Sequence, residues 1–112
     1  MTTSGWIGVD LDGTLAHYDG WRGIDHVGDP VPAMLQRVKE WIAGGIEVKI
    51  FTARVYAPDP EVVEHIHLWC EKHGLPRLEV TCVKDFGMIH LYDDRATGVE
   101  INTGKLLSPS PY

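Results

Sequence analysis

The chain has 112 residues, an apolar content of 44% and a net charge of −6, which is typical of one globular domain. Its 10 basic residues are dispersed, so the charge does not favour nonspecific binding to nucleic-acid phosphates. No apolar run approaches the ~20 residues of a membrane span, and the N-terminus lacks the basic and apolar regions of a secretory signal. We therefore expect a cytoplasmic protein with no membrane partner.

Short apolar runs alternate with helical patterns along the chain, which predicts an α/β domain built on a parallel sheet. We expect one domain over residues 1–112, with a core over about 5–102 and a tail over 103–112. The first strand is predicted at about Gly5 to Asp10. Residues 15–30 are rich in Gly, Asp and aromatic residues and show no lasting period. We interpret them as a turn and a small β-hairpin flap.

Two amphipathic helices are predicted next. Asp29 suits the cap of the first helix, which Gly44 and Gly45 would end. Its apolar face repeats at spacings of three and four and comprises Met34, Leu35, Val38, Trp41 and Ile42. The second helix is predicted to start at residues 58–60 and to end at Gly74. Its buried side would comprise Val62, Val63, Ile66, Trp69 and Cys70.

Further strands are predicted at residues 47–52, 78–82 and 88–93. Val99 and Ile101 alternate with polar residues, as in an edge strand with one buried face. The expected fold is therefore a parallel sheet with helices on both faces and a hairpin flap.

Side chains that could bind a metal ion or take part in catalysis follow three of these strands. Asp10-Leu11-Asp12-Gly13-Thr14 comes directly after the first, Thr52 ends the second, and Asp93-Asp94-Arg95 follows a later one. The carboxyl ends of parallel strands meet at one edge of a sheet, where open α/β sheets bind ligands. Carboxylate oxygens there could hold Mg²⁺, which prefers oxygen ligands. Residues far apart in the sequence are thus expected to form one site.

This ordered set resembles the haloacid dehalogenase (HAD) superfamily of aspartate-nucleophile phosphotransferases, from Trp6 to about Ile101. The resemblance implies a single Rossmann-like domain that uses Mg²⁺ as its cofactor. It implies that Asp10 attacks phosphorus to give an aspartyl-phosphate, and that Asp12 is the general acid and base. The metal would take the carboxylate of Asp10, the backbone carbonyl of Asp12, and the pair Asp93 and Asp94. One of that pair would bind directly and the other through water, with Asp94 favoured as the direct ligand.

The resemblance also implies a phosphate-binding set. Thr52 would donate its hydroxyl to a phosphate oxygen beside the backbone N–H groups of Ala53 and Arg54. Thr52 could instead cap a helix, and the Arg54 side chain could contact the substrate or pair with an acid. Lys84 is the best match for the lysine that offsets phosphoryl charge in this superfamily. Two further candidates for that role are Lys49 and Lys105.

Neither interval between the motifs has room for the cap domain that most HAD hydrolases carry. Small capless phage and bacterial HAD-like proteins are the most similar group. An open site implies that a large substrate or a neighbouring subunit of a homo-oligomer covers it. Trp21 and Arg22, between Gly20 and Gly23 of the flap, could contact the substrate there, or Trp21 could pack on the first helix.

The leading hypothesis is a Mg²⁺-dependent phosphomonoester hydrolase. Its substrate would be a phosphorylated small molecule or a phosphorylated nucleic-acid end. Two alternatives stay open. The first is a noncatalytic phosphate- or Mg²⁺-binding regulatory module, and the second is a phosphotransferase that uses an acceptor other than water.

Overall fold

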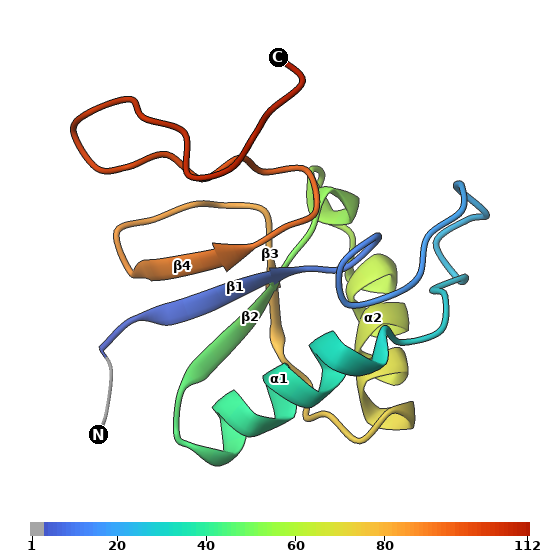
Figure 1. Cartoon of the computed structure of the whole chain (residues 1–112). Helices are drawn as coiled ribbons and strands as arrows, with labels where there is room; N and C mark the ends of the chain where they lie inside the picture. Colours follow the sequence, from blue (N-terminus) through green and yellow to red (C-terminus); the bar gives the residue numbers. More distant parts are fainter. Residues whose placement is uncertain (1–3) are drawn as a thin grey trace.

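A parallel four-stranded sheet forms the centre of the computed structural model, which describes residues 4–112 (Figure 1). The strands lie in the order β3-β2-β1-β4, and all three neighbouring pairs are parallel. The elements are β1 (Trp6–Asp10), α1 (Pro32–Ala43), β2 (Glu47–Phe51), the 3-10 helix η1 (Ala53–Val55), α2 (Pro60–Lys72), β3 (Glu79–Thr81) and β4 (Met88–Tyr92). The predicted α/β class and parallel sheet are confirmed.

Both helices pack on the same face of the sheet. Val38 of α1 and Ile66 of α2 belong to one buried cluster with Ile50 of β2. Along the chain, β1, β2 and β3 are added to the sheet in one direction, each beside the strand before it. The two right-handed crossovers between them therefore place both helices on one side of the sheet. The expectation of helices on both faces is therefore corrected. Residues 82–87, which connect β3 to β4, are too few for a crossover helix, since such a connection needs about a dozen residues.

The helix-free face carries a polar network around Trp6. The Trp6 indole Nε1 donates a hydrogen bond of 3.0 Å to Asp85 Oδ1, and Trp6 is only 3% exposed. The Lys49 ammonium lies 4.6 Å from the centre of the Trp6 ring and 3.1 Å from a carboxylate oxygen of Glu79. Asp85 thereby fixes the β3–β4 connection on this face.

The helix starts agree with the sequence at α2 but not at α1. Asp59 caps α2, because its carboxylate accepts a hydrogen bond of 3.0 Å from the backbone N–H of Glu61. At α1 the cap residue is Val31, with no side-chain capping bond, so the prediction of an Asp29 cap is wrong. Asp29 lies further out, where its carbonyl accepts a hydrogen bond of 2.7 Å from the His17 N–H.

Residues 17–29 form a long loop over the carboxyl end of β1 instead of a paired hairpin. A single antiparallel bridge between Ala16 and Pro30 closes its base. The loop is anchored further along, because the Trp69 indole donates a hydrogen bond of 2.8 Å to the carbonyl of Gly28. A Cβ at Gly28 would lie 2.1 Å from the carbonyl oxygen of His17, so the base of the loop requires glycine there.

The C-terminal segment forms a turn, and the edge strand predicted there is not found. Val99 is bridged only to Leu106, and both side chains are exposed. Asn102 has a φ of 64° and reverses the chain between them. No helix within residues 4–112 is long and apolar enough to cross a membrane.

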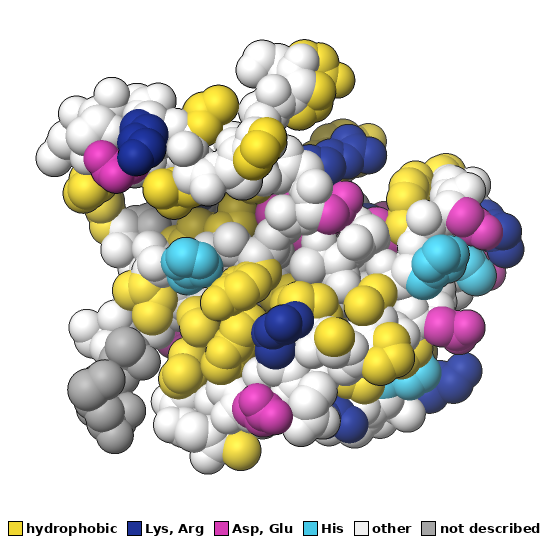
Figure 2. All heavy atoms as spheres, in the orientation of Figure 1, with side chains coloured by type: hydrophobic (Ala, Val, Ile, Leu, Met, Phe, Trp, Pro, Cys, Tyr) yellow, Lys and Arg dark blue, Asp and Glu magenta, His cyan; other side chains and the backbone are white. Residues whose placement is uncertain are grey.

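An apolar strip joins α1 to the edge strand β4. The Trp41 and Tyr92 rings lie 4.7 Å apart, and the His90 ring lies 5.0 Å from that of Tyr92. Figure 2 shows hydrophobic side chains gathered on the viewed face between the region of β4 and α1. These contacts tie β4, which ends at the acidic pair, to the helical layer.

Candidate functional site

Three carboxylates meet at the carboxyl ends of β1 and β4. Each of Asp10, Asp93 and Asp94 places an oxygen so that all three oxygens lie within 4.8 Å of one another. β1 and β4 are adjacent, and the strand order reverses beside them, which is where α/β sheets bind ligands. Parallel pairing thus brings together residues that lie more than 80 positions apart in the chain.

The crowded carboxylates perturb one another. Burial raises the pKa of Asp10 to about 7, helped by a hydrogen bond with Asp94 and by the negative charges of Asp93 and Asp94. Burial also acts to raise the pKa of Asp94, but hydrogen bonds from Asp10 and from the Thr14 hydroxyl outweigh it and lower that pKa. The set contains only oxygen ligands and excess negative charge. Such a set fits a hard divalent cation such as Mg²⁺.

Thr14 connects the two motifs, a role that sequence reasoning missed. Its hydroxyl donates a hydrogen bond of 2.8 Å to Asp94 Oδ1 and accepts one of 3.0 Å from the Asp94 N–H. The same oxygen lies 3.4 Å from Asp10 Oδ2. Thr14 belongs to the first motif, but its spacing from Asp10 did not indicate a hydrogen-bond partner in the last motif.

Gly13 allows the first motif to approach Asp94 closely. Its φ is +93°, and a Cβ would lie 2.8 and 2.9 Å from the two Asp94 carboxylate oxygens. We expect Gly13→Ala to lower the free energy of unfolding by about 1–3 kcal/mol and to displace Asp94. Urea unfolding measures the first effect, and loss of Mg²⁺-induced thermal stabilisation measures the second.

Gly45→Ala is the matched control for this prediction. Gly45 has a φ of +81°, but a Cβ there would meet nothing within 4 Å, so this variant reports backbone strain alone. An equal loss of stability in the two variants, with the Mg²⁺ effect intact in both, would show that contact with Asp94 is unimportant.

Thr52 directly follows β2 and lines the same cavity as Asp10 and Asp94. It is 2% exposed, and its hydroxyl oxygen accepts a hydrogen bond of 3.2 Å from the Arg54 N–H. The capping role left open by the sequence is therefore present, at η1. Since the oxygen accepts this bond, the hydroxyl proton remains available to donate to a ligand.

Arg54 pairs with Asp12, which is one of the two roles considered for it. Its Nε and Nη2 lie 2.7 and 2.8 Å from the two carboxylate oxygens of Asp12. Nη2 also donates a hydrogen bond of 3.0 Å to the carbonyl of His26 in the loop. The side chains of Arg54 and Asp12 are 5% and 19% exposed. The pair therefore holds the Asp12 carboxylate and the loop together.

The structure does not bring the predicted lysine to the site. Lys84 is exposed and does not line the cavity that contains the acids. The connection that carries Lys84 is held on the helix-free face by the bond between Asp85 and Trp6. Lys49 is engaged on that face as well. Among the described residues that line the cavity, the cations are Arg54 and Arg95.

A cavity of about 970 Å³ opens over the acids. Its lining residues include Asp10, Asp12, Thr52, Ala53, Arg54, Asp93 and Asp94 on the polar side, with Tyr18, Trp21, Ile24, Phe51 and Tyr56 around them. The aromatic side chains were not predicted as a group, because they come from separate segments. The cavity thus combines acids, a hydroxyl and aromatic walls.

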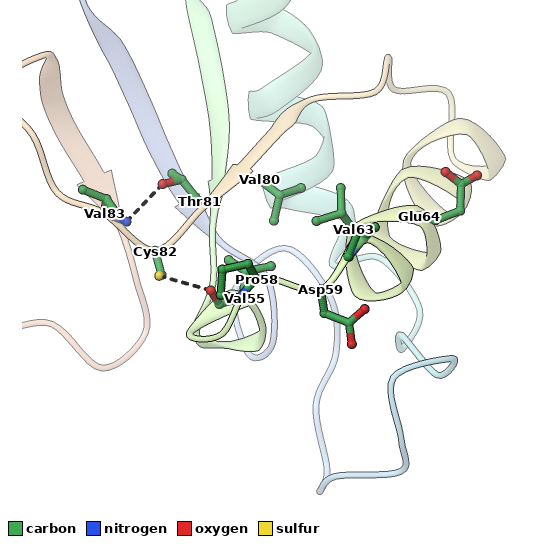
Figure 3. Close-up of a pocket in the computed structure, with 10 residues that line it drawn as sticks. Val55, Pro58, Asp59, Val63, Glu64, Val80, Thr81, Cys82 and Val83 are labelled. Atoms are coloured by element: carbon green, nitrogen blue, oxygen red, sulfur yellow. Dashed lines mark hydrogen bonds between the residues drawn. The ribbon is translucent and has the colours of Figure 1, made fainter.

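A second cavity, of about 470 Å³, shares Asp59 and Cys82 with the first. Figure 3 shows the residues that line this second cavity. Valine and proline side chains form much of its lining. Its acids have structural partners, since Asp59 caps α2 and Glu64 lies 2.8 Å from Arg77. The larger cavity is therefore the candidate chemical site.

Comparison with known proteins identifies the fold. No family model matches the chain, and no curated protein matches it in sequence. Among solved structures it is similar to a conserved protein coded by a locus from Bacteroides thetaiotaomicron, with a TM-score of 0.63 and 17% sequence identity. The similarity covers 84% of this chain and 78% of that chain. At this identity the likeness shows the fold alone, which is a single-domain α/β fold of Rossmann-like type.

Proposed function

We propose that this protein is a Mg²⁺-dependent phosphomonoester hydrolase with Asp10 as its nucleophile. The observation that carries the proposal is the meeting of Asp10, Asp93 and Asp94 in a cavity that also contains the Thr52 hydroxyl. The order of the motifs along the chain, which resembles HAD phosphatases, supports the same chemistry. The substrate would be a phosphate monoester that enters the open cavity.

The residues present fit a magnesium ion. Asp10 and Asp94 would hold it, with the backbone carbonyl of Asp12 and with Asp93 through water. When bound, it would neutralise charge on the phosphoryl oxygens. Its positive charge would offset the burial and the like-charge repulsion that raise the pKa of Asp10, and would so keep that carboxylate ionised and nucleophilic.

The reaction divides between two carboxylates. An Asp10 oxygen forms a bond to phosphorus as the ester P–O bond breaks, and the leaving oxygen takes a proton from Asp12. Water then attacks phosphorus, gives its proton to Asp12 and releases phosphate from Asp10. Thr52 would donate a hydrogen bond to a nonbridging oxygen throughout.

The Arg54 pair controls when Asp12 can act. Because both Asp12 oxygens accept hydrogen bonds from Arg54, proton transfer requires this pair to open at least in part. The His26 carbonyl links the same guanidinium to the loop. Substrate that displaces the loop would therefore free Asp12 to take up a proton from solvent, which it then gives to the leaving oxygen.

Arg54→Ala tests this coupling. We expect the free energy of unfolding to fall by about 2–3 kcal/mol, because a nearly buried partner of Asp12 is lost. We also expect kcat to fall by about 10-fold or more, because Asp12 loses its orientation. Arg54→Lys keeps the charge but not the bidentate geometry, so it should recover stability better than kcat. Wild-type values of both in Arg54→Ala would show that the pair is incidental.

The function itself is tested by phosphate release. Purified protein is assayed with p-nitrophenyl phosphate and a panel of phosphorylated sugars, nucleotides and 3′-phosphorylated oligonucleotides, with and without Mg²⁺. Turnover that chelation abolishes is expected. If no phosphomonoester is turned over with any divalent cation, the hydrolase proposal is rejected. Product analysis with added alcohols separates hydrolysis from transfer to another acceptor.

One observation favours a noncatalytic binding module as the second candidate. The Asp12 side chain is clamped by Arg54 and contributes no oxygen to the cluster of three acids. Calorimetric titration with Mg²⁺ and with inorganic phosphate measures binding independently of turnover. Binding without turnover of any ester would support this candidate, whereas steady-state turnover excludes it.

A further inference from the structure

Trp21 lines the cavity and lies against Arg54. The guanidinium carbon of Arg54 lies 4.9 Å from the centre of its ring, which places a cation against one face of the indole. Arg54 is in turn fixed by Asp12 and by the carbonyl of His26. Trp21 nevertheless remains 56% exposed. The ring thus has one face supported by the protein and much of its surface open.

This exposure is not that of a packing tryptophan. Trp69, which anchors the loop, is 6% exposed, and Trp6 is 3% exposed. Both use their indole N–H in a hydrogen bond within the fold. The loop is already held by Trp69, Ile24 and its base, so Trp21 is not needed to close it.

Besides Phe51 at the end of β2, two further aromatic side chains line the same cavity. Tyr18 lies in the loop with Trp21, and Tyr56 follows η1. They are 40% and 85% exposed. A cavity of about 970 Å³ is also far larger than a phosphate group requires, and sites of roughly 300–1,000 Å³ take whole organic ligands. An organic leaving group therefore has room in an aromatic-lined space beyond the acids.

We propose that the substrate is a mononucleotide, whose phosphate lies at Asp10 and whose base stacks on Trp21. The inference rests on the proposed function and names the substrate class of the same site. A base is planar and has a π-face that stacks on an aromatic ring, whereas a sugar or glycerol has no π-face. A polynucleotide fits less well. Its backbone needs a track of cations, and the described lining offers only Arg95 and the already paired Arg54.

The test compares adenosine 5′-monophosphate with ribose 5-phosphate, which lacks only the base. We expect kcat/KM to be about 5- to 150-fold higher for the nucleotide, the range that one base–aromatic stack provides. Trp21→Ala should remove this preference, because kcat/KM should fall more for the nucleotide than for ribose 5-phosphate and the ratio of the two should approach one. Trp21→Phe should retain part of the preference. Phe86→Ala, which changes a fully exposed aromatic residue outside the cavity, should retain all of it.

Binding keeps the inference testable apart from turnover. Quenching of tryptophan fluorescence by adenosine 5′-monophosphate, and not by ribose 5-phosphate, is expected in Asp10→Asn and should disappear when Trp21→Ala is added. Equal kcat/KM and equal binding for the two ligands overturn the inference while the phosphatase proposal stands. Phosphotyrosine is the remaining arm of the test. A higher kcat/KM for phosphotyrosine than for the nucleotide, lost in Trp21→Ala, would overturn the inference. It would show that the group stacked on Trp21 is a phenol ring and not a base.

Discussion

Asp10→Asn is expected to abolish turnover and, in the metal-free protein, to increase stability above pH 7. Loss of a covalent nucleophile removes the route through the aspartyl-phosphate, so kcat should fall by more than about 10³-fold. The stability gain has a separate cause, because Asp10 is ionised at high pH beside two other carboxylates. Only the size of the loss in kcat bears on the role of Asp10 as the nucleophile.

The direction of the pH effect follows from the pKa of Asp10. Burial raises that pKa from its ordinary value of 3.8 to about 7, so at intermediate pH the folded state binds a proton that the unfolded chain does not. The stabilising contribution of Asp10 is therefore fully present below about pH 4 and is lost as pH rises through 7. Because Asp10 is only partly buried, solvent screening limits the loss to about 1–2 kcal/mol. Asn carries no such dependence.

Urea unfolding with chelator present, at pH 5 and pH 8, measures this difference. Asp85→Asn is an informative control because hydrogen bonds from Trp6 and from the Gly87 N–H lower the pKa of Asp85. Asp85 stabilises the fold above its ordinary pKa, so its removal should destabilise the protein at pH 8. An Asp10→Asn variant that is fully active would show that Asp10 is not the nucleophile. One that is less stable than wild type at pH 8 would contradict the electrostatic argument.

Local patterns were sufficient to predict the elements that place the acids. Apolar runs located β1 and β4, and parallel pairing then required Asp10 and Asp94 to meet, since the carboxyl ends of parallel strands share one edge. The cap at Asp59 was predictable because the Asp-Pro pair acts within a single turn. These features depend on neighbours in sequence or on one simple rule of topology.

Features that depend on loop paths were not predictable from the residues alone. The ion pair between Arg54 and Asp12 and the stack of Arg54 on Trp21 depend on the course of residues 17–29, which have no periodic pattern. The path of Lys84 is set by the bond between Trp6 and Asp85, across 79 positions of the chain. The single-faced helical layer, in contrast, had a visible signal, because the predicted β3 and β4 are separated by too few residues for a helix.

Mg²⁺ is expected to stabilise the folded protein, and Asp94→Asn is expected to remove that effect. A ligand that binds only the folded state adds about 2.7 kcal/mol at one hundred times its Kd, which is readily seen as a rise in Tm. Asn at position 94 keeps an oxygen that can accept the Thr14 hydrogen bond of 2.8 Å, so the fold should be retained while one negative ligand is lost. Turnover should fall together with the stabilisation by Mg²⁺.

Asp93→Asn should reduce the stabilisation by Mg²⁺ less than Asp94→Asn does, because Asp93 Oδ1 already accepts a hydrogen bond of 2.8 Å from the Arg95 N–H. Asp85→Asn should respond to Mg²⁺ as wild type does. Equal stabilisation of wild type and Asp94→Asn by Mg²⁺ would show that the ion binds elsewhere. The proposed metal site between Asp10 and Asp94 would then be wrong.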